Sequence, residues 1–157
     1  MGELFLIVLV VAAALALGAL LGWRPLRRFG RQVHIERARE SFRLHREGLE
    51  AKFIQAAQAS GKPRGLNWKD CQFEQSIEFV RDKKTGDIAA LVGVTIAFEA
   101  AVGSDMVGNP NVENLRNASA VFFFHKGHWN TVGRAVFNMN PPEAIEHFKN
   151  QYERVGL

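Results

Sequence analysis

The N-terminal part of the chain contains a long uncharged run, and this feature constrains the fold most. No side chain from position 4 to position 23 carries a charge. At 1.5 Å per residue, a helix of about 20 residues matches the ~30 Å hydrocarbon thickness of a bilayer. Many of these residues are leucine, isoleucine, valine or phenylalanine, which favour insertion. The run therefore predicts a transmembrane anchor over residues 1–23.

Four arginines follow the run directly and predict its orientation. They are Arg24, Arg27, Arg28 and Arg31. Short flanks rich in arginine stay on the cytoplasmic side of a membrane. We therefore expect a single-pass protein with its N-terminus outside and its C-terminal domain in the cytoplasm. The lipid bilayer would be a partner, with the four arginines at its headgroups. The opposite topology and a cleaved secretory signal are the alternatives.

Small residues recur within the run at four-residue spacing. They are Ala14, Gly18 and Gly22. Small residues at this period allow two transmembrane helices to approach closely. The spacing predicts a dimer face on the anchor.

The positive charge of the chain is concentrated beside this run. Residues 24–60 carry nine basic and four acidic side chains, and together with Glu3 they account for the whole net charge of +4. Residues 61–157 are neutral. A nucleic-acid-binding domain spreads basic side chains over a folded face. We therefore expect no nucleic-acid partner.

Residues 24–60 predict a basic, amphipathic juxtamembrane helix. Its apolar residues recur at spacings of three and four, as a helix with one buried face requires. They are Ile35, Ala38, Phe42, Leu49, Phe53 and Ala56. The glycine and proline in the sequence Ser60-Gly61-Lys62-Pro63 end the helix. We expect residues 29–60 to pack on residues 61–157 as one α+β domain.

From Gln72 onward the apolar residues alternate with a period of two, which predicts an antiparallel sheet of four strands. The expected strands cover residues 72–80, 88–98, 117–125 and 128–139, and a two-residue turn at Lys126-Gly127 would pair Phe124 with Trp129. A short C-terminal helix follows, with Asn140 as its N-cap and Glu143 completing a capping box. This order of elements is similar to that of cystatin-like and NTF2-like proteins. Similar order alone does not imply a function.

No motif predicts catalysis or a cofactor. His125, His128 and His147 would bind zinc only if they converged, and no further ligand has supporting spacing. Cys71 has no nearby histidine in the sequence to lower its pKa. The polar loop 103–116 is longer than a hairpin requires, which makes it a candidate for binding. We expect no catalytic residue, no metal and no cofactor, and the sequence names no small-molecule ligand.

One face of the expected sheet predicts an interface. Val121, Phe123, Val132 and Val136 lie opposite the face that holds Phe122 and Phe124. The short C-terminal helix cannot cover all four, and exposed apolar patches are typical of interfaces. The sequence therefore predicts a non-enzymatic protein-binding or assembly module, with a protein partner or a second copy bound there.

Two other functions are compatible with the same pattern. The first is a ligand-binding or enzymatic pocket between the sheet and residues 29–60. The second is an assembly subunit with its domain on the outer side of the membrane. Its architecture would resemble secretion-system subunits that carry one anchor and an NTF2-like domain.

Overall fold

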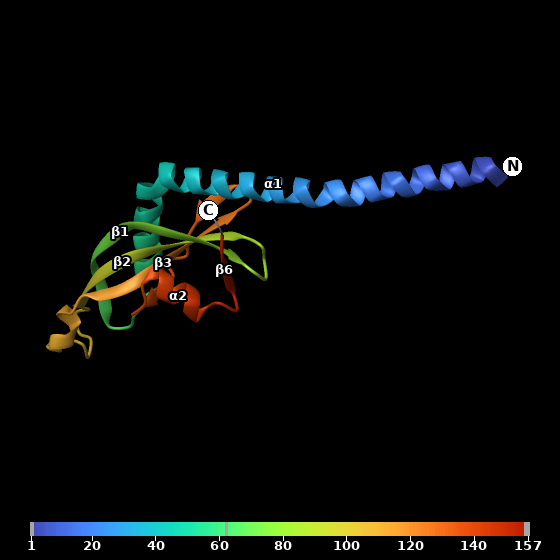
Figure 1. Cartoon of the computed structure of the whole chain (residues 1–157). Coiled ribbons are helices and arrows are strands. Elements are labelled where there is room, and N and C mark those ends of the chain that lie inside the picture. Colours follow the sequence, from blue (N-terminus) through green and yellow to red (C-terminus); the bar gives the residue numbers. More distant parts are fainter. Residues whose placement is uncertain (1, 62, 156–157) are drawn as a thin grey trace. The chain divides into compact units, whose positions relative to one another are not determined.

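The computed structural model describes the backbone of residues 2–61 and 63–155 (Figure 1). Up to residue 31 it describes the side chains of positions 2, 6–13, 15, 17 and 18. The chain divides into two compact units, Met1–Arg37 and Ala38–Leu157. Helix α1, Gly2–Ala59, contributes residues to both units. Each unit is described by itself.

The N-terminal unit exposes its apolar side chains. Eight of them have between 52% and 70% of their surface accessible: Leu6, Ile7, Val8, Leu9, Val10, Val11, Leu15 and Leu17. Nevertheless, none of the helices formed by the described residues has the length and apolar character that crossing a membrane requires. The predicted transmembrane anchor is therefore wrong, and so is the single-pass localisation with a cytoplasmic C-terminal domain.

The prediction rested on a single run of residues. A span needs about 20 consecutive residues of high mean hydropathy. The prediction used twelve leucine, isoleucine, valine and phenylalanine side chains between positions 4 and 21. Four of these, Leu4, Phe5, Leu20 and Leu21, lie outside the described side chains, and the described residues alone do not form such a run.

The C-terminal unit confirms the predicted α+β class and its antiparallel sheet. The strands are β1 Leu66–Asp82, β2 Ile88–Ala100, β3 Arg116–His125, β4 His128–Asn130, β5 Ala135–Phe137 and β6 Tyr152–Arg154. A short 3₁₀ helix, η1 Pro110–Glu113, precedes β3, and α2 spans Pro141–His147. The sheet has the order β4-β3-β2-β1-β6, and β5 also pairs with β3.

The structure has six strands, so the prediction of four was wrong at two places. The expected fourth strand is divided into β4 and β5 because residue 133 approaches α1. Gly133 has φ +70°, and a Cβ at this position would overlap the backbone of Ala57. The second place is Tyr152–Arg154, which was expected to be helical. It pairs instead with the end of β1 as β6.

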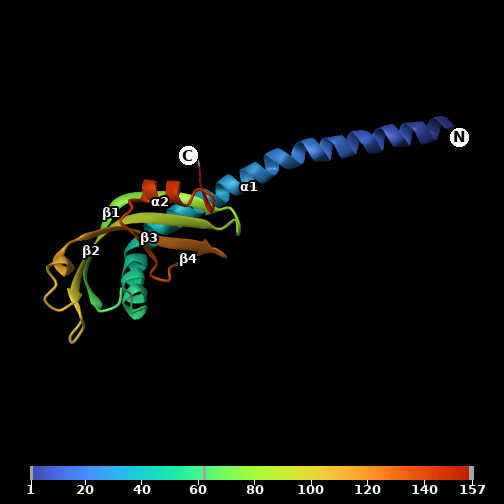
Figure 2. The ribbon, with the colours of Figure 1, turned by 90° about the horizontal axis from the view of Figure 1, so that it is seen from below.

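Aromatic side chains fill the space between the sheet and residues 38–59 of α1. Figure 2 shows this part of α1 on one face of the sheet and α2 on the other. Phe42 is fully buried. Its ring centroid lies 4.8 Å from that of Trp129, 5.3 Å from that of Phe122 and 5.9 Å from that of Phe79. Phe53, also fully buried, contacts Phe122 at 5.7 Å. Such packing combines apolar burial with favourable edge-to-face geometry.

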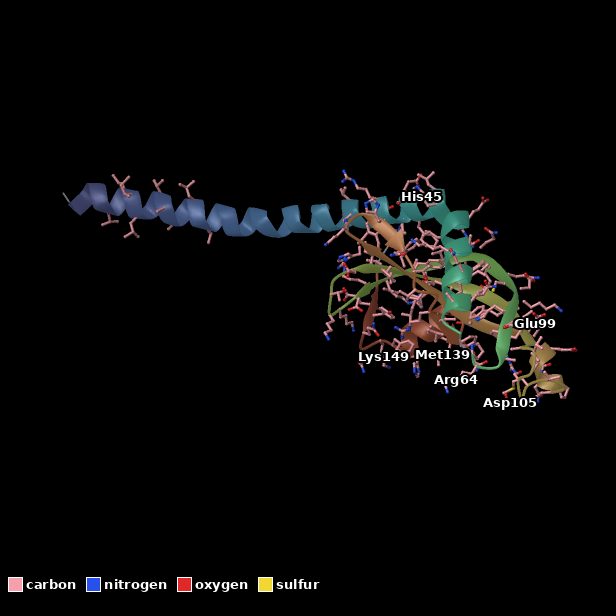
Figure 3. The ribbon with its side chains drawn as sticks, turned by 180° about the vertical axis from the view of Figure 1, so that it is seen from behind. His45, Arg64, Glu99, Asp105, Met139 and Lys149 are labelled. Carbon is pink, nitrogen blue, oxygen red and sulfur yellow. The ribbon has the colours of Figure 1, made fainter. Side chains whose placement is uncertain are left out.

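Helix α1 bends within the C-terminal unit, and Figure 3 labels His45 at the bend. The Nδ1–H of His45 donates to the Ser41 carbonyl oxygen at 2.8 Å. This carbonyl is also the normal acceptor for the backbone N–H four residues later, so the side chain enters the helical hydrogen-bond ladder. Gly48 follows within one turn. The bend is therefore encoded locally by His45 and Gly48.

Side chains of α1 also bind carbonyl groups of β1. The guanidinium of Arg46 donates to the Glu74 and Gln75 carbonyls, where β1 shifts register against β2. Closer to the end of the helix, the Gln58 amide donates to the Trp68 carbonyl at 3.4 Å. These bonds hold the outer strand against the helix at two separate positions.

Replacing Phe42 by alanine should destabilise the fold strongly. The substitution leaves a cavity among three aromatic rings, and such losses cost about 3–5 kcal/mol. Leu44→Ala is the matched control, since Leu44 lies on the same helix with 73% of its surface exposed. We expect that control to change the free energy of unfolding by less than about 0.5 kcal/mol. Urea denaturation measures both, and equal losses would contradict the assigned core.

Gly133→Ala should destabilise the protein more than Gly127→Ala does. Both glycines have positive φ, so each alanine adds backbone strain of about 1–2 kcal/mol. Only the Cβ at position 133 overlaps other backbone atoms, whereas position 127 opens to free space. Thermal melts of the two variants make the comparison. A similar melting temperature for both would mean that the approach of residue 133 to Ala57 is not a close contact.

Candidate functional site: a cleft on the sheet

Helix α2 covers only part of the sheet face that lies opposite α1. Beneath α2, buried apolar residues form a small cluster: Val80, Ala89, Leu91, Ala144, Ile145 and Tyr152. Beside this cluster the face opens into a cleft of about 620 Å³, which we call the sheet cleft. Five of its lining residues are aliphatic or phenylalanine and form its apolar part: Ile88, Ala89, Val121, Phe123 and Val132. The cleft therefore offers an apolar surface next to a packed core.

The β1–β2 turn supplies one acidic side of the cleft through Asp82. One carboxylate oxygen of Asp82 accepts the backbone N–H groups of Lys84 and Thr85. The other accepts from the Gln151 amide at 2.9 Å. The hydrogen bond from Gln151, followed by that from Thr85, lowers the pKa of Asp82. This carboxylate thus fixes the turn and the chain that leads into β6.

A second acid at the same turn faces a histidine across the sheet. The Asp87 carboxylate lies 3.3 Å from Nδ1 of His125, which ends β3. The backbone N–H of Asp87 donates to the Thr85 hydroxyl at 3.2 Å. Both side chains of the pair are substantially exposed. The pair therefore positions the imidazole at the rim of the sheet cleft.

Two cationic side chains, Lys52 from α1 and Arg134, also line the sheet cleft. Arg134 places its guanidinium 5.7 Å from the centroid of the Phe148 ring. Tyr152 lies in the same lining, and burial raises its pKa, with the charge of Arg134 opposing and that of Asp82 adding to the shift. The lining therefore holds both acids from the β1–β2 turn and cations from other elements.

The described lining of the sheet cleft includes groups that also occur in catalytic sites. It contains an aspartate–histidine pair, which orients an imidazole in many hydrolytic sites. However, the described lining residues include neither serine nor cysteine to act as a nucleophile. In the described part of the chain, no group of three or more His, Cys, Asp or Glu side chains is placed to hold a metal ion. The volume lies within the usual range of ligand and peptide sites.

A second cleft, of about 670 Å³, lies on the other side of the β3–β4 hairpin. It is bordered by the bend of α1, including Leu44 and His45. His128 and Trp129 line both clefts. The hairpin turn is the predicted two-residue Lys126–Gly127 turn, and the expected pairing of Phe124 with Trp129 is confirmed.

Three of the four residues predicted to form an interface line the sheet cleft. These are Val121, Phe123 and Val132, and Val132 has 65% of its surface exposed. Val136 instead packs against the cluster beneath α2. The structure therefore brings most of the predicted apolar face into one depression.

The three histidines considered as zinc ligands do not lie together. His125 and His128 line the sheet cleft, whereas the His147 ring packs against Phe148 at 4.7 Å. In the polar loop 103–116, η1 is capped by Asn109, whose side chain accepts from the Asn111 N–H. Val107 in this loop is 62% exposed. The loop is thus locally ordered by its own polar side chains.

The other predicted site residues belong to the N-terminal unit. The side chains of Ala14, Gly22, Arg24, Arg27, Arg28 and Arg31 lie outside the described residues. Gly18 is exposed, with open space at its missing Cβ. The proposed dimer face and lipid contacts therefore have no described geometry.

Sequence reasoning missed the charged members of the cleft. Lys52 was visible only as a break in the apolar seam of the helix. Arg134 and Tyr152 gave no signal, because they meet only when β6 returns to pair with β1. Asp87 was expected in a turn. Its neighbour on the adjacent strand, His125, is set by the register of β2 with β3.

Comparisons with protein-family models, with curated proteins and with solved structures find no match to this chain. Its function must therefore be argued from the sheet cleft itself.

Cys71 lies outside the cleft on β1 and is partly buried. Burial, with a smaller contribution from the Asp70 carboxylate, raises the pKa of its thiol to about 11. The thiolate is the reactive form, so very little of it exists at neutral pH. This cysteine is therefore unreactive in the folded protein.

Alkylation of Cys71 by iodoacetamide should be slow at pH 8 and accelerate toward pH 11. The rate follows the thiolate fraction, which rises about tenfold per pH unit below the pKa. In urea the pKa should return to about 8.5, and the rate at pH 8 should rise about tenfold or more. Mass spectrometry measures the adduct. Rapid labelling of the folded chain at pH 8 would show that the thiol is not shielded.

Proposed function

We propose that residues 38–155 form a non-enzymatic protein-binding module. Its sheet cleft receives an apolar segment of a partner protein. One observation carries the proposal: the apolar side chains of the sheet continue past the edge of α2 into the lining of the sheet cleft, where Phe123 is partly buried and Val132 is 65% exposed. Apolar surface in a depression, next to polar side chains, is typical of interaction sites.

The two faces of the sheet support this assignment by contrast. On the α1 side, Phe42 and Phe53 are fully buried and fill the space that an internal ligand would need. On the α2 side, Phe123 is partly buried and Val132 is 65% exposed in the lining of the sheet cleft. A partner that buries these residues gains roughly 25 cal/mol for each Å² of apolar area removed from water. Binding at the open face therefore requires no disruption of the core.

A photo-crosslinker at position 132 should capture the partner. Val132→benzoylphenylalanine places the reactive group in the cleft, where the native side chain is 65% exposed. Val107 is the matched control, since it is another valine with 62% exposure in the loop before η1. We expect a discrete adduct from position 132, identified by mass spectrometry, and much less from position 107.

Phe123→Ser should reduce that adduct because it removes apolar surface from the cleft. An adduct of twice the mass of the chain would identify a second copy as the partner. Equal amounts of adduct from positions 132 and 107 would show that the binding is nonspecific. An adduct from position 107 alone would assign it to the loop, and either result would overturn the proposal.

A further inference from the structure

The acids of the sheet cleft are engaged within the protein. Asp82 accepts from two backbone N–H groups and from Gln151. Asp87 faces the imidazole of His125 at 3.3 Å. Neither carboxylate therefore needs a cation from a ligand.

The two cations of the cleft, Lys52 and Arg134, differ from the acids in their partners. Among residues 2–61 and 63–155, neither Lys52 nor Arg134 takes part in an ion pair. The contact made by the Arg134 guanidinium is with the face of the Phe148 ring. A guanidinium over an aromatic face keeps its N–H donors available at the ring's edge. Arg134 thus presents free donors beside the apolar lining.

This asymmetry identifies the charge of the bound segment. Arg binds carboxylates through two parallel hydrogen bonds, which are stronger than bonds between neutral groups. Lys52, which also lines the cleft, adds attraction for an anion. A basic segment would meet acids that already have partners and cations that repel it.

We propose that the sheet cleft binds an acidic segment of the partner protein. An apolar side chain of that segment lies against Phe123 and Val132, and a neighbouring carboxylate binds Arg134. This inference rests on the proposed function and adds the chemistry of the partner.

The test uses the full chain and three fluorescein-labelled peptides. Each peptide holds a leucine next to a phenylalanine, flanked by glutamates, by lysines or by glutamines. Fluorescence anisotropy measures their dissociation constants. We expect the glutamate peptide to bind about tenfold more tightly than the lysine peptide, since one charge-assisted pair contributes at this level. High salt should reduce the difference because it screens the exposed charges.

Variants assign the preference to one side chain. Arg134→Gln should bring the glutamate and lysine peptides to within about twofold, and Arg134→Glu should invert their order. Arg64→Gln is the matched control, because it removes the same charge from an exposed position that does not line the cleft (Figure 3). That variant should keep the full preference. Circular dichroism establishes that each variant is folded.

The outcomes separate this inference from the proposed function. Equal binding of all three peptides, lost in Phe123→Ser, would overturn the acidic preference and leave docking in the cleft intact. A glutamate preference that persists in Arg134→Gln would overturn the role of Arg134. Absence of binding by every peptide would overturn the inference, while the adduct at position 132 still decides whether the cleft docks a protein.

Discussion

The packing of Phe42 and Phe53 against the sheet is the constraint on which the C-terminal unit depends. Phe42 alone contacts rings from β1, β3 and β4. The buried Trp129 indole also donates to the Ala38 carbonyl at 2.8 Å, which fixes the height of the helix over the edge strand. These buried side chains therefore pack the space between helix and sheet.

The opposite face has a much smaller cover. Helix α2 has seven residues, and Ala144 and Ile145 are its buried aliphatic side chains. The apolar cluster beneath α2 includes Tyr152 and Leu91 but does not include Phe123. A two-layer domain normally buries one face of its sheet and solvates the other. Here the second face is divided between the cluster beneath α2 and the lining of the sheet cleft, where Val121 is buried, Phe123 is partly buried and Val132 is exposed, so the position of the cleft follows from the length of α2.

The sequence predicted features that depend on local pattern. The period-two alternation located the strands, the Lys126–Gly127 turn set the register of Phe124 with Trp129, and Asn140 with Glu143 formed the expected capping box. Features that depend on distant contacts were missed. The division into β4 and β5 results from the approach of Gly133 to Ala57. Tyr152 continues the helical spacing of α2 and is extended only because β1 offers it a partner.

The candidate site shows the same division. The alternation of side chains along a strand was enough to place three apolar residues on one face of the sheet. These residues are Val121, Phe123 and Val132. The charged residues of the cleft could not be placed in this way, since Lys52 comes from the helix, Asp87 from a turn and Arg134 from the segment between two strands. Likewise, hydropathy counted along residues 4–23 gave a membrane anchor that the structure does not support.

The hydrogen bonds that Arg46 and Gln58 make to β1 have a consequence for the whole molecule. β1 has 17 residues, and β6 pairs only with its last part, from Val80 to Asp82. A long edge of this kind normally attracts strands of other chains. At Trp68, Glu74 and Gln75 the carbonyl groups already accept bonds from α1. The register shifts beside them also interrupt the regular ladder. Helix α1 thus occupies carbonyl groups of β1 that a strand of another chain could otherwise bind, which disfavours edge-to-edge pairing.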